Sequence, residues 1–266
     1  MSLYIDQLGR EVNIPSPPLR IISLVPSITE LLFGLELGER VVGITKFCVH
    51  PLQWFREKKR IGGTKNINAD IIHTLQPDLI IANKEENIQE QVEALAAHYP
   101  VWVSDVNTLT DAMDMIRAIG TITDKPYTAF AHLSKIREGF DSLELIINAG
   151  KRPPIPTAYI IWREPYMTVG NDTFINDMLT RSGFRNVFHN TTRYPAITIE
   201  QLQQSGCKLL LLSSEPYPFK QKHIDELQPL LPNTKIVLVD GELFSWYGSR
   251  LLYAPGYFTE LLHLLS

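Results

Sequence analysis

The sequence lacks several features that would assign a function at once. No stretch approaches the roughly twenty consecutive apolar residues that a membrane-spanning helix requires. The formal net charge is −4, and no strongly basic face is evident, so we expect neither membrane insertion nor a nucleic-acid partner. The two cysteines, Cys48 and Cys207, are too few and too far apart for a disulfide framework.

Enzyme motifs are missing as well. The glycine-bearing loop at 60–66 lacks the Walker A spacing, and neither G-x-G-x-x-G nor G-x-S-x-G occurs. Cys48 and His50 are a possible pair of ligands, but no CxxC, HExxH or histidine cluster completes a metal site. We therefore expect a protein with no intrinsic cofactor or metal and no catalytic role. An enzyme that uses Cys48 and His50 is the less favoured alternative.

Apolar, strand-like runs alternate with helical patterns along all 266 residues, which is typical of βαβ units and mostly parallel sheets. Strands are expected at 21–25, 41–44, 78–82, 101–104, 158–162, 208–213 and 235–240. Helices are expected at 27–37, 86–98, 110–119, 173–181, 199–204 and 220–227, with a last one ending near Leu265. The second half repeats the scheme of the first, so we expect two α/β lobes, at 1–124 and 151–266.

A long helix is expected between the two lobes, in a connecting segment at 125–150. Apolar residues recur at spacings of three and four across 125–148, which indicates one amphipathic helix. Pro126 suits its first turn, and Gly150 followed by two prolines ends it. Such a helix would be roughly 35 Å long.

Ser27 and Glu30 follow an expected strand and precede an apolar run, the pattern of a capping box. We expect Ser27 to cap this helix. The arrangement places a helix N-terminus at the carboxyl edge of a strand, where open α/β sheets bind ligands and where exposed N–H groups suit an anion. Ser27 is therefore also a candidate ligand contact.

Aromatic and basic residues collect in loops that follow strands, where they would offer apolar area and charge to a ligand. These candidates are Phe47, Lys65, Lys84, Trp162, Arg163, Tyr166, Trp246, Tyr247 and Arg250. With Ser27, Cys48 and His50 they form the predicted ligand-binding set.

Long blocks of the sequence resemble one family. Residues 20–45, residues 61–82 and the mid-chain helix, in this order, are similar to the class III substrate-binding proteins of ABC importers, which include the vitamin B12 and ferric siderophore receptors. The second half continues the similarity in YIIWREPYMTVGNDTFINDML, RYPAITIEQL and DGELFSWYGSRL. The resemblance, from Asp6 onward, implies two lobes with mostly parallel sheets flanked by helices, joined by one long helix, with a metal chelate bound in the cleft between them.

The resemblance also implies a partner and a location. In this family one glutamate on each lobe docks onto arginines of the permease. Glu200 matches the second-lobe glutamate, whereas the first-lobe position aligns with Gln89, beside Glu86 and Glu90. We expect a monomer that meets its permease in the periplasm or at the cell surface.

The N-terminal segment has no basic stretch followed by an apolar one, so it shows no secretory signal. Either a leader has been removed or the protein is made without one. A cytoplasmic carrier or sensor for a tetrapyrrole or metal complex therefore stays as an alternative.

The sequence leaves several candidate ligands. Where the resemblance leads us to expect aromatic residues of a vitamin B12 receptor, this sequence has Lys65 and Asn83. The cationic residues after the strands would suit an anionic chelate, and they are Lys46, Lys65, Lys84, Arg163 and Arg250. A corrinoid, a haem and a ferric siderophore are all candidate ligands.

Overall fold

The structure is a computed structural model that describes residues 1–151 and 153–265. The chain divides into two compact units. Unit 1 comprises residues 1–106, 110–135 and 247–249, and unit 2 comprises residues 107–109, 136–246 and those from 250 onward. The division falls inside α6 (Pro126–Gly150), so this helix contributes residues to both units.

Unit 1 is built on a five-stranded parallel sheet. Its strand order is β5 (Lys59–Arg60), β4 (Val41–Ile44), β3 (Ile21–Ser23), β6 (Leu79–Asn83) and β7 (Val101–Ser104). An antiparallel hairpin of β1 (Ser2–Ile5) and β2 (Glu11–Ile14) precedes it. The helices are α1 (Pro26–Gly34), α2 (Leu52–Glu57), α3 (Ala69–Leu75), α4 (Gln89–Ala96) and α5 (Leu109–Ile122).

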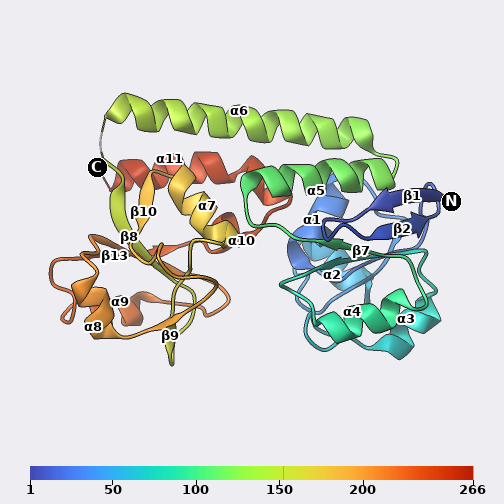
Figure 1. The fold of residues 1–266 in the computed structure, drawn as a ribbon, viewed down its shortest axis with the longest axis horizontal. Helices are drawn as coiled ribbons and strands as arrows, with labels where there is room; N and C mark the ends of the chain where they lie inside the picture. The colour runs from blue at the N-terminus through green and yellow to red at the C-terminus, as the bar shows by residue number, and fades with distance from the viewer. Residues whose placement is uncertain (152, 266) are drawn as a thin grey trace. The chain divides into compact units, whose positions relative to one another are not determined.

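The apolar character of these strands follows from their position between helices. Every residue of β3, β6 and β7 is buried. Figure 1 shows α5 on one side of β7, with α3 and α4 on the other. Strands covered on both faces need apolar side chains throughout, which is why they read as continuous runs rather than as alternating ones.

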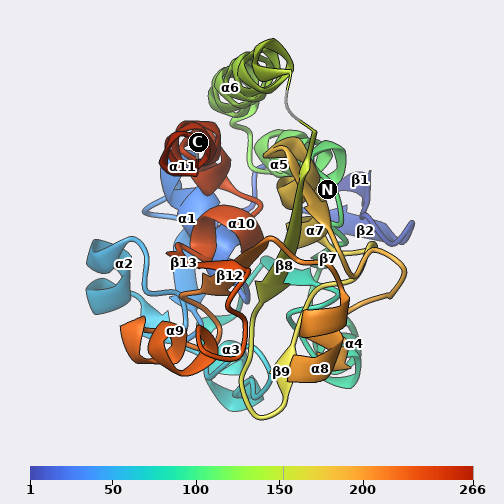
Figure 2. The same ribbon diagram turned by 90° about the vertical axis from the view of Figure 1, so that its left-hand side faces the viewer.

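Unit 2 contains a four-stranded parallel sheet in the order β10 (Phe184–Asn186), β8 (Ile155–Ile160), β12 (Leu209–Ser213) and β13 (Lys235–Val239). A two-stranded antiparallel ribbon pairs β9 (Tyr166–Met167) with β11 (Ala196–Ile197). Its helices are α7 (Phe174–Arg181), α8 (Ile199–Gln204), α9 (Gln221–Leu227), α10 (Glu242–Ser245), α11 (Ala254–Leu264) and the 3-10 helix η1 (Ser249–Leu252). Helices α7 and α11 lie on one face of this sheet, and α8 and α9 on the other (Figures 1 and 2).

Each sheet has a point at which the strand order reverses direction. In unit 1, β3 pairs with β4 on one side and with β6 on the other. In unit 2, β8 pairs with β10 on one side and with β12 on the other. Open parallel sheets bind ligands outside the carboxyl ends of their strands at such switch points, because the loops diverge there and leave room.

The expected fold class is confirmed, including the long helix, which runs over Pro126–Gly150 instead of 125–148. Gly139 in its middle has a packing reason. A Cβ at this position would approach Pro255 Cγ to 3.0 Å, so the glycine allows α6 and α11 of unit 2 to lie close together. No helix within the described residues combines the length and apolar character needed to cross a membrane.

The expected capping box at Ser27 is wrong. Helix α1 begins one residue earlier, at Pro26, and its N-cap Val25 makes no side-chain cap bond. A proline suits this first position because it has no N–H to satisfy. Ser27 is therefore buried in the first turn, and the carboxylate of Glu30 accepts from Ser249 Oγ at 3.3 Å instead.

Candidate ligand-binding site at the strand ends

The loops at the carboxyl edge of the unit 1 sheet are tied together by hydrogen bonds. The N–H of Lys46, after β4, donates to the carbonyl of Gly62, after β5, at 2.8 Å. Lys65 Nζ donates to the carbonyl of Glu85, after β6, at 2.6 Å. The predicted residues Phe47, Lys65 and Lys84 are therefore brought to one edge of one sheet, as their positions after strands led us to expect.

Phe47 provides an aromatic surface at this edge. Its side chain is 51% exposed, and Lys46 Nζ lies 5.1 Å from the centre of its ring. The ring packs on Gly63, where a Cβ would come within 3.0 Å of Phe47 Cε2. An exposed ring supported from one side can stack against a large apolar ligand.

Asn83, the last residue of β6, and Lys84, the first residue after it, have different surroundings. Asn83 is buried, and its Oδ1 accepts from the N–H groups of Glu85 and Glu86, so it shapes the loop and offers no surface to a ligand. Lys84 is exposed, and its Nζ lies 2.6 Å from Asp105 Oδ2. The positive charge of Lys84 is therefore already compensated.

The loop after β4 also carries Cys48 and His50, the possible ligand pair of the sequence. The Cys48 thiol is fully buried beneath its loop and lies 3.0 Å from Thr29 Oγ1 and 3.1 Å from Thr45 Oγ1. Burial raises the pKa of the Cys48 thiol, which disfavours the thiolate that nucleophilic attack or metal binding requires. His50 is half-buried. Among the described residues, no group of three or more His, Cys, Asp or Glu side chains could hold a metal ion.

The chain after β8 carries Trp162 and Arg163 in a loop and Tyr166 at the start of β9. Trp162 is 40% exposed and meets Tyr217 edge to face, with ring centroids 5.8 Å apart. Arg163 Nη2 lies 2.8 Å from Glu226 Oε2. Tyr166 is half-buried against the apolar core of unit 2, and burial raises its pKa. Trp162 is thus the exposed aromatic of this loop, whereas the charge of Arg163 is compensated.

A second cluster in unit 2 surrounds Trp246. The indole is buried, and its Nε1 donates to Glu215 Oε1 at 3.0 Å. The guanidinium of Arg250 lies 5.2 Å from the indole ring centre and is paired with Glu242 Oε2 at 2.8 Å. Two carboxylates thus hold the aromatic and cationic side chains that the sequence predicted.

Tyr247 falls with Ser27 in unit 1, unlike its neighbours Trp246 and Arg250. Both Tyr247 and Ser27 are buried. Gly248 follows Tyr247, and a Cβ there would lie 2.5 Å from the carbonyl oxygen of Ser27, so only glycine fits. The structure therefore gives Ser27 a backbone contact, with its hydroxyl shielded from solvent.

The predicted docking residues lie at helix starts. Glu200 is exposed in the first turn of α8, and its own backbone N–H and the Thr198 hydroxyl lower the pKa of its carboxyl. Gln89 and Glu90 are exposed in the first turn of α4, whereas Glu86 is half-buried. Glu200 and Glu90 are thus accessible to a partner, and their docking role stays a prediction.

Sequence reasoning missed the carboxylates of unit 2, which are Glu215, Glu226 and Glu242. The rule that found the aromatic residues could have found Glu215, because it also comes just after a strand, two residues beyond β12. The sequence interpretation selected aromatic and cationic residues alone, and so it left their partners out.

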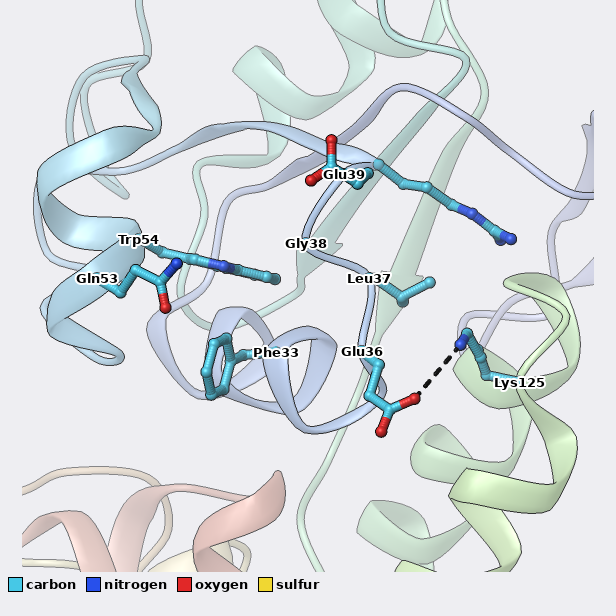
Figure 3. Close-up of a pocket in the computed structure, with 9 residues that line it drawn as sticks. Phe33, Glu36, Leu37, Gly38, Glu39, Gln53, Trp54 and Lys125 are labelled. Atoms are coloured by element: carbon cyan, nitrogen blue, oxygen red, sulfur yellow. Dashed lines mark ion pairs between the residues drawn. The ribbon is translucent and has the colours of Figure 1, made fainter.

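A separate hollow of about 450 Å³ lies at the opposite edge of unit 1, between the end of α1 and the start of β4. Figure 3 shows Phe33 and Trp54 on one side of it, and the ion pair of Glu36 with Lys125, 3.7 Å apart, on the other. None of the predicted site residues lines it. It lies at the amino edge of the sheet, away from the strand ends described above.

Residues 21–231 match the family model described as periplasmic binding protein, and this chain belongs to that family. Among curated relatives, the vitamin B12-binding protein of Photorhabdus laumondii is 26% identical over 239 residues, which cover 89% of this chain and 85% of the relative. The vitamin B12-binding protein of Pectobacterium carotovorum is 24% identical and covers 94% of this chain and 90% of its own.

Solved structures share the fold. The periplasmic vitamin B12-binding protein of Vibrio cholerae superposes with a TM-score of 0.79 at 22% identity, covering 93% of this chain and 98% of the other. A periplasmic haem-binding protein from Pseudomonas aeruginosa gives a TM-score of 0.80 at 20% identity, covering 92% of each chain. One fold thus serves proteins named for different ligands, so the choice of ligand must rest on this chain's own side chains.

Proposed function

We propose that this protein is the substrate-binding component of an ABC importer and that it carries a corrinoid of the vitamin B12 type. The observation that supports this most is the pair of parallel sheets whose strand-end loops present aromatic side chains, Phe47 in unit 1 and Trp162 in unit 2. The family and the names of the curated relatives agree with this assignment.

Three of the five cations that the sequence places after strands lie beside carboxylates, and these ion pairs favour a corrinoid over a carboxylate-bearing chelate. Lys84, Arg163 and Arg250 each lie beside a carboxylate at 2.8 Å or less. An anionic siderophore or haem would have to displace these partners to gain the full attraction of the cations. A ligand whose periphery carries neutral amides has no such cost, because amides can bond to both members of an existing ion pair.

No catalytic role is part of this proposal. The one thiol near the strand ends of unit 1, that of Cys48, is buried and held protonated, and carriage of a ligand requires only binding and release. A Cys48→Ala protein is expected to bind ligand with unchanged affinity. A large loss of binding in that protein would revive the alternative of a site built on Cys48 and His50.

The partner that follows from this function is the membrane permease of the importer, met outside the cytoplasmic membrane. Glu200 and Glu90 are exposed carboxylates at helix starts and contribute little to folding, so they are available to arginines on a partner. Glu86 is half-buried and bonded through its N–H to Asn83, which makes Glu90 the better first-unit candidate.

Uptake by cells tests this function. A bacterium that lacks its own vitamin B12-binding protein would receive this protein, with an export signal and together with its own permease, and accumulation of labelled cyanocobalamin would be measured. We expect uptake that depends on the protein and falls in a Glu200→Ala variant with an unchanged melting temperature. The exposed Glu144→Ala variant on α6 is the matched control. Uptake of a ferric siderophore but not of cyanocobalamin would overturn the proposed ligand.

A further inference from the structure

Glu215 lies at the switch point of the unit 2 sheet. Among the described residues, hydrogen-bond donors reach only one of its two carboxylate oxygens. It lies two residues after β12, the strand that pairs with β8 where the strand order reverses. This is the position at which open parallel sheets bind their ligands. The function proposed above assigns no role to this residue.

The backbone of Glu215 is held by a short chain of hydrogen bonds. Tyr159, which is fully buried, donates its hydroxyl to Ser213 Oγ at 3.0 Å. Ser213 Oγ in turn donates to the carbonyl oxygen of Glu215 at 2.5 Å. These bonds anchor the loop after β12 to the middle of the sheet.

The side chain of Glu215 is held as well. A Cβ at Gly241 would meet Glu215 Cγ at 2.8 Å, so the loop after β13 lies directly against this side chain. Oε1 accepts hydrogen bonds from Ser245 Oγ at 2.6 Å and from Trp246 Nε1 at 3.0 Å. The carboxylate is therefore fixed before any ligand arrives, which lowers the entropic cost of using it in recognition.

The other oxygen, Oε2, is available. It accepts no hydrogen bond from any residue that the structure describes, and it is not among the fully buried polar atoms without a partner. Glu215 as a whole is half-buried. Solvent, or a ligand, can therefore reach this oxygen.

The charges around Glu215 are mostly negative. Burial raises the pKa of the Glu215 carboxyl, and the nearby charges of Glu242 and Asp240 raise it further. The cation nearby, Arg250, is paired with Glu242. An incoming carboxylate would therefore be repelled by Glu215, Glu242 and Asp240, whereas an N–H donor would find an oriented acceptor.

We propose that Glu215 is a specificity-determining residue that accepts an N–H from a primary amide of the ligand and disfavours a carboxylate at the same place. The proposal rests on the proposed function and adds to it a requirement on the ligand's periphery. Side-chain amides of a corrin ring supply such N–H groups, and hydrolysis of one amide replaces two donors by a negative charge.

The experiment compares ligands that differ by one amide. Calorimetric titrations would measure the affinity of the whole protein for cyanocobalamin and for each of its monocarboxylic acids, in which one side-chain amide is hydrolysed. For the wild type we expect cyanocobalamin to bind roughly tenfold or more tightly than at least one of these acids, the size expected for losing a hydrogen bond to a charged group.

In the Glu215→Gln variant, the affinity for cyanocobalamin and the affinity for the more weakly bound acid should become similar. The glutamine keeps an oxygen for Ser245 and Trp246 but places a neutral NH₂ at the open position, and this NH₂ can donate to a carboxylate. The affinity ratio is the decisive readout, because a merely structural role would weaken both ligands alike. Glu144→Gln on α6 exchanges an exposed carboxylate in the same unit and should leave the ratio as in the wild type.

The outcomes separate the two proposals. Equal binding of amide and acids by the wild type, or the same preference in Glu215→Gln, would overturn the role of Glu215 and leave the function intact. Absence of cyanocobalamin binding by the wild type would overturn the function and this inference together.

Discussion

The two units present their strand ends in chemically different ways. In unit 1 much of the loop framework is neutral, such as the side chain of Asn83 and the carbonyl of Gly62, although Lys84 pairs with Asp105, and Phe47 is exposed beside this framework. In unit 2 charged groups form the framework. Glu215 holds Trp246, and Arg250 is paired with Glu242 while it covers the indole.

This difference predicts which substitutions change ligand binding and which change the free energy of unfolding. A side chain that stands on a neutral framework can be removed without leaving an orphaned charge, so in unit 1 a change should alter the binding surface alone. In unit 2 the same residues that face a ligand also compensate one another's charges, and removing one leaves its partner uncompensated. We therefore expect substitutions that remove one member of an ion pair in unit 2 to cost stability, and substitutions of exposed side chains such as Phe47 in unit 1 to cost affinity.

The largest loss of stability is expected for Gly241→Ala in unit 2. Its Cβ would come within 2.2 Å of Ser213 Oγ and 2.8 Å of Glu215 Cγ, and both atoms belong to an anchored loop. Overpacking of this kind costs about 1–3 kcal/mol, which urea denaturation would measure.

Two glycines serve as controls for Gly241. At Gly63 in unit 1 the nearest atoms belong to the side chains of Phe47 and Lys46, which can move, so Gly63→Ala should cost less. At Gly256 in α11 a Cβ meets nothing within 4 Å, and Gly256→Ala should be neutral or stabilising. Equal losses of unfolding free energy in Gly241→Ala and Gly63→Ala would contradict the expected difference between the units.

Arg250→Ala should destabilise the protein by about 1–2 kcal/mol, between the values for exposed and buried ion pairs, because its side chain is only 19% exposed. The substitution removes the guanidinium that lies 2.8 Å from Glu242 Oε2, so adding Glu242→Gln should recover part of the lost stability. Arg117→Ala breaks an exposed pair with Asp114 and serves as the control, with an expected loss below about 0.5 kcal/mol. Chemical denaturation of these three variants and the wild type gives the comparison, and no recovery of stability in the double variant would contradict the expectation.

Phe47→Ala should weaken cyanocobalamin binding by about 1 kcal/mol while leaving the melting temperature nearly unchanged. The ring is half exposed and rests on Gly63, so its removal opens no cavity in the core. Titration calorimetry and a thermal melt on the same sample check both halves of this expectation. A marked drop in melting temperature would show that the unit 1 loops depend on this ring.

Glu215→Gln should give the smallest change in stability, and the size of this change should depend on pH. Burial raises the pKa of the Glu215 carboxyl, with further increase from Glu242 and Asp240. The folded state therefore resists ionisation of this group. The resulting penalty is present above the raised pKa and disappears as pH falls below the ordinary glutamate value.

Glutamine carries no such penalty and keeps the oxygen that Ser245 and Trp246 need. The variant should melt slightly above the wild type at neutral pH, and the difference should shrink toward about pH 4. Calorimetric melts across this range check it. A difference that grows toward acid would mean that ionised Glu215 stabilises the fold.

The sequence predicted the parallel strands and the helices of both units well, and it predicted the short antiparallel strands poorly. Strands β4 and β7 and helix α8 have the expected bounds, because buried parallel strands and a capped amphipathic turn leave clear patterns. The hairpin of β1 with β2 and the ribbon of β9 with β11 were missed. Both consist of strands of four residues or fewer, whose pairing depends on partners elsewhere in the chain.

At the candidate site, the aromatic residues could be placed from their position after strands, but their partners could not. Trp246 bonds to Glu215 across 31 residues of sequence, and local pattern does not show such a pairing. For the same reason, the prediction that Arg163 and Arg250 suit an anionic ligand did not include their partners Glu226 and Glu242. Charge counted along a sequence ignores the partners that folding supplies.

Direct binding tests the central claim that this chain carries a corrinoid. Titration calorimetry of the wild-type protein with cyanocobalamin, haemin and a ferric catecholate siderophore, followed in parallel by tryptophan fluorescence, compares the three candidate ligands on one sample. The account predicts saturable binding of cyanocobalamin with quenching of the exposed Trp162, and weaker or no binding of the two anionic chelates. Tight binding of haemin or of the siderophore, with none of cyanocobalamin, would contradict it.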